Sequence, residues 1–106
     1  MTTKELHAGL SALGYPVAYS HFSEGNMPDP PYITYTYQGT ENFSADGIVY
    51  HPVEDVDIEL YSVGKNEEAE EKISGFLKES GIFYEKQEYY IESEKLVQVI
   101  FEITLI

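Results

Sequence analysis

Cysteine and arginine are both absent from this chain of 106 residues, and each absence excludes a class of function. Without cysteine there is no disulfide, thiolate metal site, iron–sulfur cluster or cysteine nucleophile. Proteins that bind nucleic acid tightly need cations to release phosphate counterions, and they commonly use the guanidinium group of arginine. Here six lysines stand against 19 acidic residues, a formal net charge of −13. We therefore expect neither tight nucleic-acid binding nor attraction to an anionic membrane surface.

Long apolar runs are missing as well. No window approaches the ~20 apolar residues that a membrane-spanning helix needs. The first ten residues, MTTKELHAGL, have neither the apolar core nor the small-residue cleavage site of a secretory signal. Hydrophobic residues make up 42% of the chain, which is too many for a disordered protein. We expect one soluble, intracellular domain spanning residues 1–106.

Two amphipathic helices are predicted. The first spans residues 3–13, where Thr2 and Glu5 have the spacing of a capping box and leucines recur at helical spacing. The second begins after Asn66, a good N-cap, and ends at Gly81 in the left-handed conformation that glycine readily adopts. Gly75, inside this second helix, costs about 1 kcal/mol relative to alanine, so we expect it to mark close packing.

Most of the remaining chain is predicted to form strands. Alternating patterns predict strands at residues 17–22, 32–37, 47–50, 55–63, 82–91 and 95–106. We expect a loop over residues 42–47 and an interruption at Pro52, because proline cannot donate to a sheet ladder. Short connections favour antiparallel pairing. The predicted fold is α+β, with an antiparallel sheet of about four to five strands and two helices packed on one face.

The two faces of the predicted sheet differ in polarity. In the strand at 55–63, three apolar side chains point inward: Val56, Ile58 and Leu60. In the last strand, the odd-numbered residues from Val97 to Leu105 form one apolar face. The opposite face of that strand mixes Leu96 and Ile100 with polar residues. We expect this half-polar face to be covered by another strand, a helix or a second subunit.

The residues that could carry chemistry are few. Three carboxylates share the outer face of one strand, and they could serve acid–base hydrolysis or hold a hard cation, or they could form a solvated edge: Asp55, Asp57 and Glu59. The histidines are scattered without metal-ligand spacing: His7, His21 and His51. No G-x-S-x-G motif or glycine-rich phosphate loop occurs. We expect no catalytic residues, no metal, no cofactor and no enzyme activity.

Tyrosine is abundant, with ten residues, among them Tyr84, Tyr89 and Tyr90 near the last predicted hairpin and Tyr32, Tyr35 and Tyr37 in an early strand. Tyrosine is enriched at protein–protein interfaces, which favours a subunit interface. The alternative is that the rings serve the core while their hydroxyl groups reach water. For any single tyrosine we favour the core. For the set as a whole we favour an oligomer interface.

Three segments together resemble a family of proteins: PDPPYITYTY, VEDVDIELYS and GIFYEKQEYYIESEKLVQVIFEI. They are similar to small tail-completion or head–tail connector proteins of tailed phages and prophages of Gram-positive bacteria. Such proteins resemble tail terminators, which are α+β subunits that assemble as rings at the end of the tail tube. The resemblance covers most of the chain through the order and spacing of weak motifs. It implies a structural protein without catalytic residues, found in the virion and, during assembly, in the bacterial cytoplasm.

The resemblance implies partners and gives the acidity a role. The expected partners are further copies of the chain, with a hexameric ring as one candidate assembly, and other tail or connector proteins. Carboxylates that line such a ring would repel DNA phosphates over roughly 8 Å, the Debye length at physiological salt. The loops at residues 25–31 and 39–47 are natural contacts to a neighbour. The candidate interaction residues are Met27, Tyr32, Tyr35, Tyr37, Phe43 and Ile48.

Two alternative functions remain open from the residues alone. The chain could be a monomeric module that binds a protein or a small ligand. It could also be a small hydrolase that uses the carboxylates of residues 55–59. For each candidate interaction residue, packing within its own domain is the alternative to contact with a partner.

Overall fold

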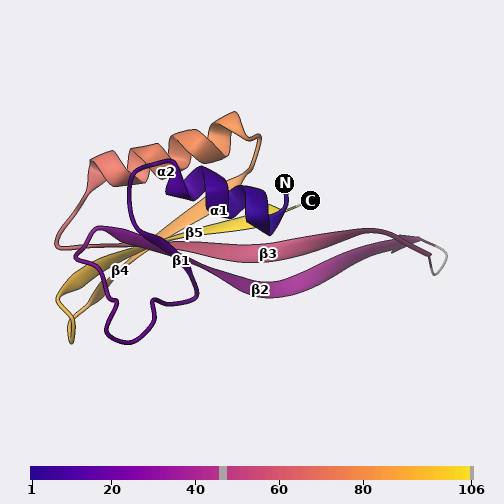
Figure 1. Ribbon diagram of the computed structural model, residues 1–106. Helices are drawn as coiled ribbons and strands as arrows, with labels where there is room; N and C mark the ends of the chain where they lie inside the picture. Colours follow the sequence, from indigo (N-terminus) through magenta and orange to yellow (C-terminus); the bar gives the residue numbers. More distant parts are fainter. Residues whose placement is uncertain (46–47, 106) are drawn as a thin grey trace.

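The protein has two layers, a sheet and a pair of helices that cover one of its faces (Figure 1). The computed structural model describes residues 1–45 and 48–105, and within this range the side chains of residues 1–40 and 53–105. In chain order, the described elements are α1 (Thr3–Ser11), β1 (Val17–Tyr19), β2 (Tyr32–Ala45), β3 (Ile48–Ser62), α2 (Glu67–Glu79), β4 (Tyr84–Ile91) and β5 (Leu96–Leu105). This arrangement confirms the predicted α+β class and the predicted placement of both helices on one face.

The sheet is mixed, with the strand order β1-β2-β3-β5-β4. Three of its pairings are antiparallel, as predicted, but β1 runs parallel to β2. The predicted antiparallel sheet is therefore confirmed for these three pairings, and the parallel pair at this edge is an exception that the sequence did not predict. The physical reason is the connection, because residues 20–31 supply the dozen residues that a parallel crossover needs. The prolines end this connection, and β2 begins directly after Pro31.

The hairpin of β2 and β3 is longer than predicted. β2 continues to Ala45 and β3 begins at Ile48, so the expected loop was wrong over residues 42–45 and the expected interruption at Pro52 was wrong; the rest of the expected loop, residues 46–47, lies outside the described residues. Pro52 lies in β3 opposite Asn42. Proline is tolerated there because β5 pairs with β3 only from Glu54 onward, which leaves the other edge of β3 without a described partner.

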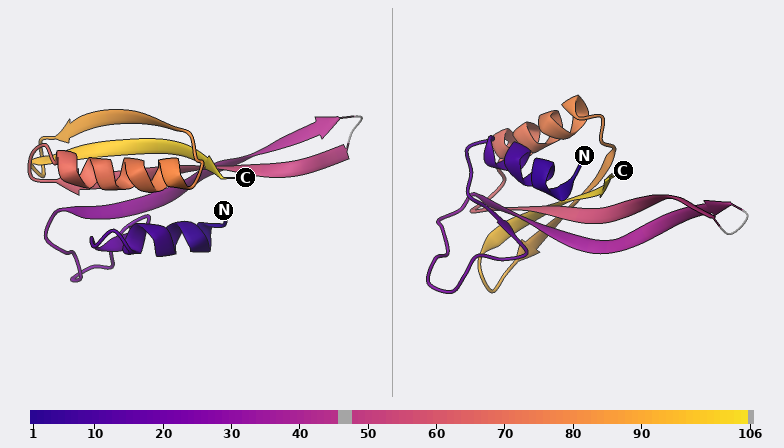
Figure 2. Two further views of the ribbon diagram at one scale, coloured as in Figure 1. Left: turned by 90° about the horizontal axis from the view of Figure 1, so that it is seen from above. Right: turned by 45° about the vertical axis from the view of Figure 1, so that its right-hand side comes forward.

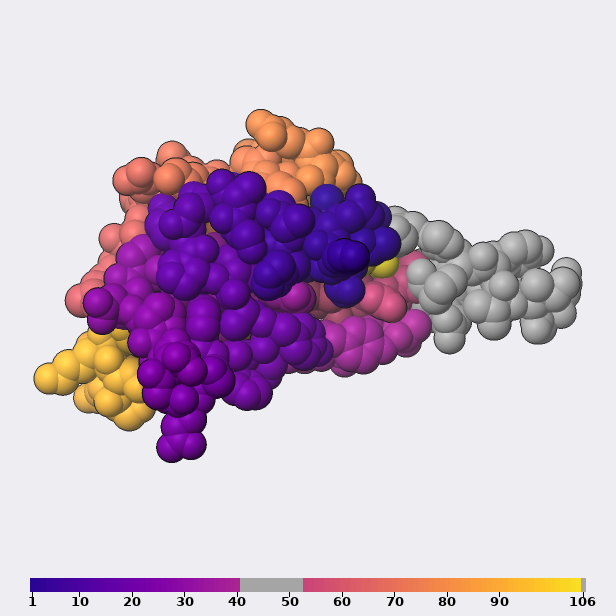
Figure 3. Space-filling view, in the orientation of Figure 1, coloured from indigo at the N-terminus to yellow at the C-terminus, as the bar shows by residue number. Residues whose placement is uncertain are grey.

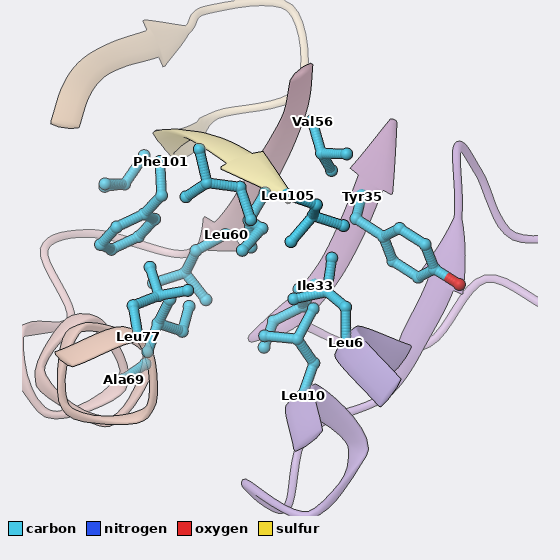
Figure 4. Packing of buried hydrophobic residues seen from close by; sticks show 14 residues of the cluster. Leu6, Leu10, Ile33, Tyr35, Val56, Leu60, Ala69, Leu77, Phe101 and Leu105 are labelled. Carbon is cyan, nitrogen blue, oxygen red and sulfur yellow. The ribbon is translucent and has the colours of Figure 1, made fainter. Parts of the chain in front are cut away.

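The core lies between the helices and the sheet (Figure 4). As predicted, Val56, Ile58 and Leu60 point inward from β3, and the inward row of β5 is centred on Phe101, which is fully buried. α2 lies over the β4–β5 side of the sheet and α1 over the β1–β2 side (Figure 2). The helices contribute the side chains of Leu6, Leu10, Ala69, Ile73 and Leu77. None of the described helices is long and apolar enough to cross a bilayer.

Close packing between the helices depends on Gly9 rather than on Gly75. A β-carbon placed on Gly9 would lie 2.3 Å from ring atoms of Phe76, which is far inside van der Waals contact. A β-carbon on Gly75 would meet nothing within 4 Å. The expectation that Gly75 marks close packing was therefore wrong, because no atom lies within contact distance of the position that its side chain would occupy.

We expect Gly9→Ala to lower the free energy of unfolding by about 1–3 kcal/mol, because the added methyl group must displace the Phe76 ring. Gly75→Ala is the matched control, and it should raise the free energy of unfolding by up to about 1 kcal/mol through helix propensity. Urea unfolding followed by circular dichroism measures both. Equal effects from the two substitutions would contradict the assignment.

Candidate functional site

The face of the sheet opposite the helices, here called the open face, carries the polar side chains of the strands. Strand alternation and register place on it the following residues: Tyr32, Thr34, Thr36, Asp55, Asp57, Glu59, Tyr61, Glu85, Gln87, Tyr89, Gln98, Ile100, Glu102 and Thr104. The connection of residues 20–31 stands out from the body (Figure 3) and covers one end of this face. There Tyr32 stacks on Tyr61 and meets Phe22 edge-on. The half-polar face is thus covered in part by the chain's own loop.

A row of carboxylates crosses three strands of the open face. Asp57 lies directly opposite Glu102, which lies directly opposite Glu85. Like charges in directly opposed positions destabilise a sheet. Burial, and after it the charges of Glu102, Glu59 and Asp55, raise the pKa of Asp57. Beside this row is an open hollow of about 480 Å³, which Phe83 also lines.

Glu59 is held differently from Asp57. It accepts hydrogen bonds from the hydroxyl groups of Thr34 (2.7 Å), Thr36 (3.3 Å) and Tyr61 (3.1 Å). Burial, together with the charge and the hydrogen bond of Glu59, raises the pKa of Tyr61 to about 12. The three predicted carboxylates therefore do share one face, but in two separate environments. Within the described residues, no three His, Asp or Glu side chains are placed to hold a metal ion together.

We expect Glu102→Gln to raise the free energy of unfolding by about 0.2–1 kcal/mol at neutral pH and low salt, because it removes the middle charge of the row. A carboxyl group whose pKa is higher in the folded than in the unfolded protein lowers the free energy of unfolding at pH values above that folded pKa. This penalty disappears as the pH falls through the folded pKa. The advantage of the variant should therefore shrink towards the ordinary pKa of aspartate, 3.8, and in high salt.

The matched control for this prediction is Glu24→Gln, which changes the net charge equally in an exposed loop. Urea unfolding at neutral pH and at a pH near the ordinary pKa of aspartate, each at low and at high salt, provides the measurement. If both variants gain the same stability, the gain reflects net charge alone and the cross-strand repulsion is refuted.

The predicted interaction residues fall into three groups. Tyr32 and Tyr35 are buried, with exposed fractions of 3% and 7%, and they pack within their own domain. The hydroxyl of Tyr35 lies 3.0 Å from Nδ1 of His7, so its polar end is satisfied internally. Met27 and Tyr37 are exposed, and their role at an interface stays a prediction. The side chains of Phe43, Ile48 and His51 lie outside the described residues. His21 lies on the surface beside Ser20.

Exposed aromatic residues gather on β4 and at its start. Phe83, Tyr89 and Tyr90 are exposed to 82%, 49% and 61%, respectively. The sequence pointed to the tyrosines near the last hairpin, but it gave no signal for Phe83. Phe83 precedes the strand and lacks the cover that the neighbouring Tyr84 finds against Phe101. Because β4 is an edge strand of the sheet, these rings lie along an edge that has no described partner strand.

An ion network that was not predicted from the sequence joins α2 to β4. Glu70 is buried, and its Oε1 accepts hydrogen bonds of 3.1 Å from both Lys65 and Lys86. Its Oε2 lies 2.9 Å from Lys65 Nζ, but outside hydrogen-bond geometry. Lys65 also pairs with Glu88 of β4. A signal was available, because Glu70 precedes Ile73 by three residues and therefore lies on the buried stripe of α2.

The far part of the β2–β3 hairpin, residues 40–45 and 48–53, is here called the arm. Its strands pair with each other, whereas β1 pairs only with residues 33–35 of β2 and β5 only with residues 54–62 of β3. Figures 1 and 2 show the hairpin running past the ends of the other strands and beyond the helices. The molecule is accordingly elongated, with extents of 50 × 29 × 23 Å.

Comparisons with known proteins do not assign a family to the chain. No family model matches it, and no curated protein is a significant match.

Proposed function

We propose that the protein is a structural subunit of a tailed phage or prophage. In this role it self-associates, with a ring as the expected form, at the head–tail junction or the tail end. It would act in the virion, and in the bacterial cytoplasm during assembly. The observation that carries this proposal is the arm, a two-stranded ribbon that extends beyond the helices and the other strands of the sheet. The sequence resemblance to tail-completion and head–tail connector proteins supplies the setting.

The arm favours assembly for an energetic reason. An isolated two-stranded ribbon is at best marginally stable in water. Each strand of the arm also has one edge whose backbone donors and acceptors have no described partner in a sheet. Pairing with a second protein would satisfy these groups and bury the ribbon. Pairing with a neighbour would therefore explain why a ribbon of this length extends from the body of the protein.

The charge of the chain is compatible with a ring through which DNA passes. The net charge is −13, and Asp57, Glu102 and Glu85 concentrate negative charge across three strands. A ring that turns this row towards its channel would repel phosphates and allow the DNA to slide. An assembled ring with the row on its outer wall and lysines around the hole would refute this part of the proposal.

The test of self-association is size-exclusion chromatography with light scattering over a range of protein concentrations, followed by electron microscopy of the largest species. We expect a discrete species whose mass is a multiple of 12.1 kDa and whose images show a central hole. A mass of 12.1 kDa at every concentration, with no association on purified tail tubes, would contradict the proposal.

A monomeric binding module is the second candidate, and one observation favours it. An open hollow of about 540 Å³ lies between the connection of residues 20–31 and the turn between β4 and β5, and it is lined by Met27, Pro28, Pro30, Tyr32, Val63, Glu94, Lys95 and Leu96. Val63→Ala separates the two functions, since it should weaken ligand binding by a module but leave the mass of an arm-dependent oligomer unchanged.

A further inference from the structure

We propose that the arm of one copy pairs with the outer edge of β4 in a second copy and so extends the sheet of that copy. This inference rests on the self-association proposed above and names the two surfaces that meet. Strand addition of this kind obtains its affinity from main-chain hydrogen bonds, which both surfaces can supply. The occupant of the β4 edge is thus another molecule of this chain.

The outer edge of β4 is the more suitable of the two sheet edges. Along the eight residues of β4, β5 pairs with only one side, and the side chains from Glu85 to Tyr90 are all exposed. At the opposite edge, β1 pairs with β2 over only three residues. Pro16 precedes β1 and has no N–H, and Ser20 follows it with a φ of 64°, which turns the chain away. Of the two edge strands in the described part of the chain, β4 is therefore the one that presents a full strand.

Two of the three charged side chains of β4 are engaged within the subunit, and the third, Glu85, belongs to the carboxylate row of the open face. Charged side chains on an edge strand normally prevent edge-to-edge pairing. Here Lys86 is paired with Glu70, and Glu88 is paired with Lys65, so both charges on the helix side are engaged within the subunit. Tyr89 and Tyr90 remain exposed on opposite faces of the strand. An incoming strand could therefore bury aromatic area on both faces.

The geometry also predicts the kind of assembly. The arm extends β2 and β3 away from the sheet, whereas β4 is the far edge strand, so the arm cannot reach the β4 of its own chain (Figure 2). The contact joins two different surfaces, and each copy offers both of them. Such head-to-tail contacts generate rings when the rotation closes and filaments when it does not.

Engineered cysteines test this contact cleanly, because the natural chain has none. The two double variants place Thr40→Cys at the base of the arm together with either Gln87→Cys or Tyr89→Cys on β4. Thr40→Cys with Glu79→Cys, an exposed position on α2, is the matched control. Each protein is treated with a short bismaleimide at a concentration where light scattering reports an oligomer, and is then separated by denaturing electrophoresis.

We expect a ladder of covalent multimers from at least one β4 variant and not from the α2 control. Variants that carry only one of these cysteines should run as monomers on the denaturing gel. An oligomer without a ladder would overturn the arm–β4 contact and leave the self-association intact. Efficient dimers from the variant with Thr40→Cys alone would show that two arms pair with each other, and this result would also overturn the arm–β4 contact. A monomer by light scattering at every concentration, with no association on purified tail tubes, would remove both the contact and the proposed function.

A shortened arm provides the second test. Replacing residues 41–53 by Asn-Gly keeps every pair between β3 and β5 and supplies a favoured hairpin turn. The concentration needed for half-maximal association should rise at least about tenfold, which corresponds to about 1.4 kcal/mol. Circular dichroism checks that the variant folds, and a folded variant that associates like the natural chain would overturn the inference.

Discussion

Phe101→Ala is expected to lower the free energy of unfolding by about 3–5 kcal/mol, the largest effect of any single substitution considered for this protein. Phe101 is fully buried in the centre of β5, between the neighbours Ile58 on β3 and Lys86 on β4. The ring of Tyr84 packs against it at 5.5 Å between centroids. Removing the ring leaves a cavity beneath α2. Because β5 pairs with β3 on one side and with β4 on the other, its backbone cannot move to fill this cavity.

The matched control is Phe83→Ala, because Phe83 is 82% exposed and lies only three residues before Lys86, the β4 residue opposite Phe101. Its removal should change the free energy of unfolding by no more than about 0.5 kcal/mol. Natural domains are stable by about 5–15 kcal/mol, so the buried substitution should remove a large share of the total. Urea unfolding measures both, and similar losses from the two phenylalanines would refute the described core.

Glu70→Gln is expected to lower the free energy of unfolding by about 2 kcal/mol at neutral pH, because it removes the charge that two lysines share. The loss should be smaller than for a wholly buried pair. Lys65 and Lys86 have side chains that are 47% and 44% exposed, so water can hydrate them when the partner is gone. Glu71→Gln, an exposed neighbour on the same helix, is the control and should be nearly neutral.

The pH dependence gives this prediction a second readout. Burial opposes the ionisation of Glu70, but the hydrogen bonds from Lys65 and Lys86 outweigh it, so the pKa of Glu70 lies below its ordinary value of 4.5. The unfolded chain then binds the proton more readily than the folded one. The stabilisation is present above the ordinary pKa and is lost as the pH falls below it. A difference between the natural chain and the variant that stays constant through this acid range would contradict the ion network.

Local chemistry explains why parts of the fold could be predicted from the sequence. The capping box of Thr2 and Glu5 and the N-cap at Asn66 are present, since each depends on residues three positions apart. Gly81 ends α2 with a φ of 71°. The inward rows of β3 and β5 follow from simple alternation, which needs no knowledge of the neighbouring strand.

The features that were missed depend on residues far apart in the chain. The parallel β1 and the long hairpin depend on which strand lies beside which, and local patterns do not contain that information. Gly9 is required because Phe76 of the other helix lies against it. In the candidate site, the sequence placed Asp57 correctly on the outer face, but its conflict with Glu102 appears only when the register is known.

Hydrogen exchange of the backbone amides of the arm, measured at low and high protein concentration, bears most directly on the claim that this ribbon is an assembly element. The amides of β5, which pairs on both sides within the subunit, serve as the internal reference. We expect arm amides to exchange rapidly in the dilute monomer and to become protected as the protein associates, while β5 amides stay protected throughout. Arm amides that exchange at the same rate in the monomer and in the assembled protein would contradict the claim that the arm is an assembly element.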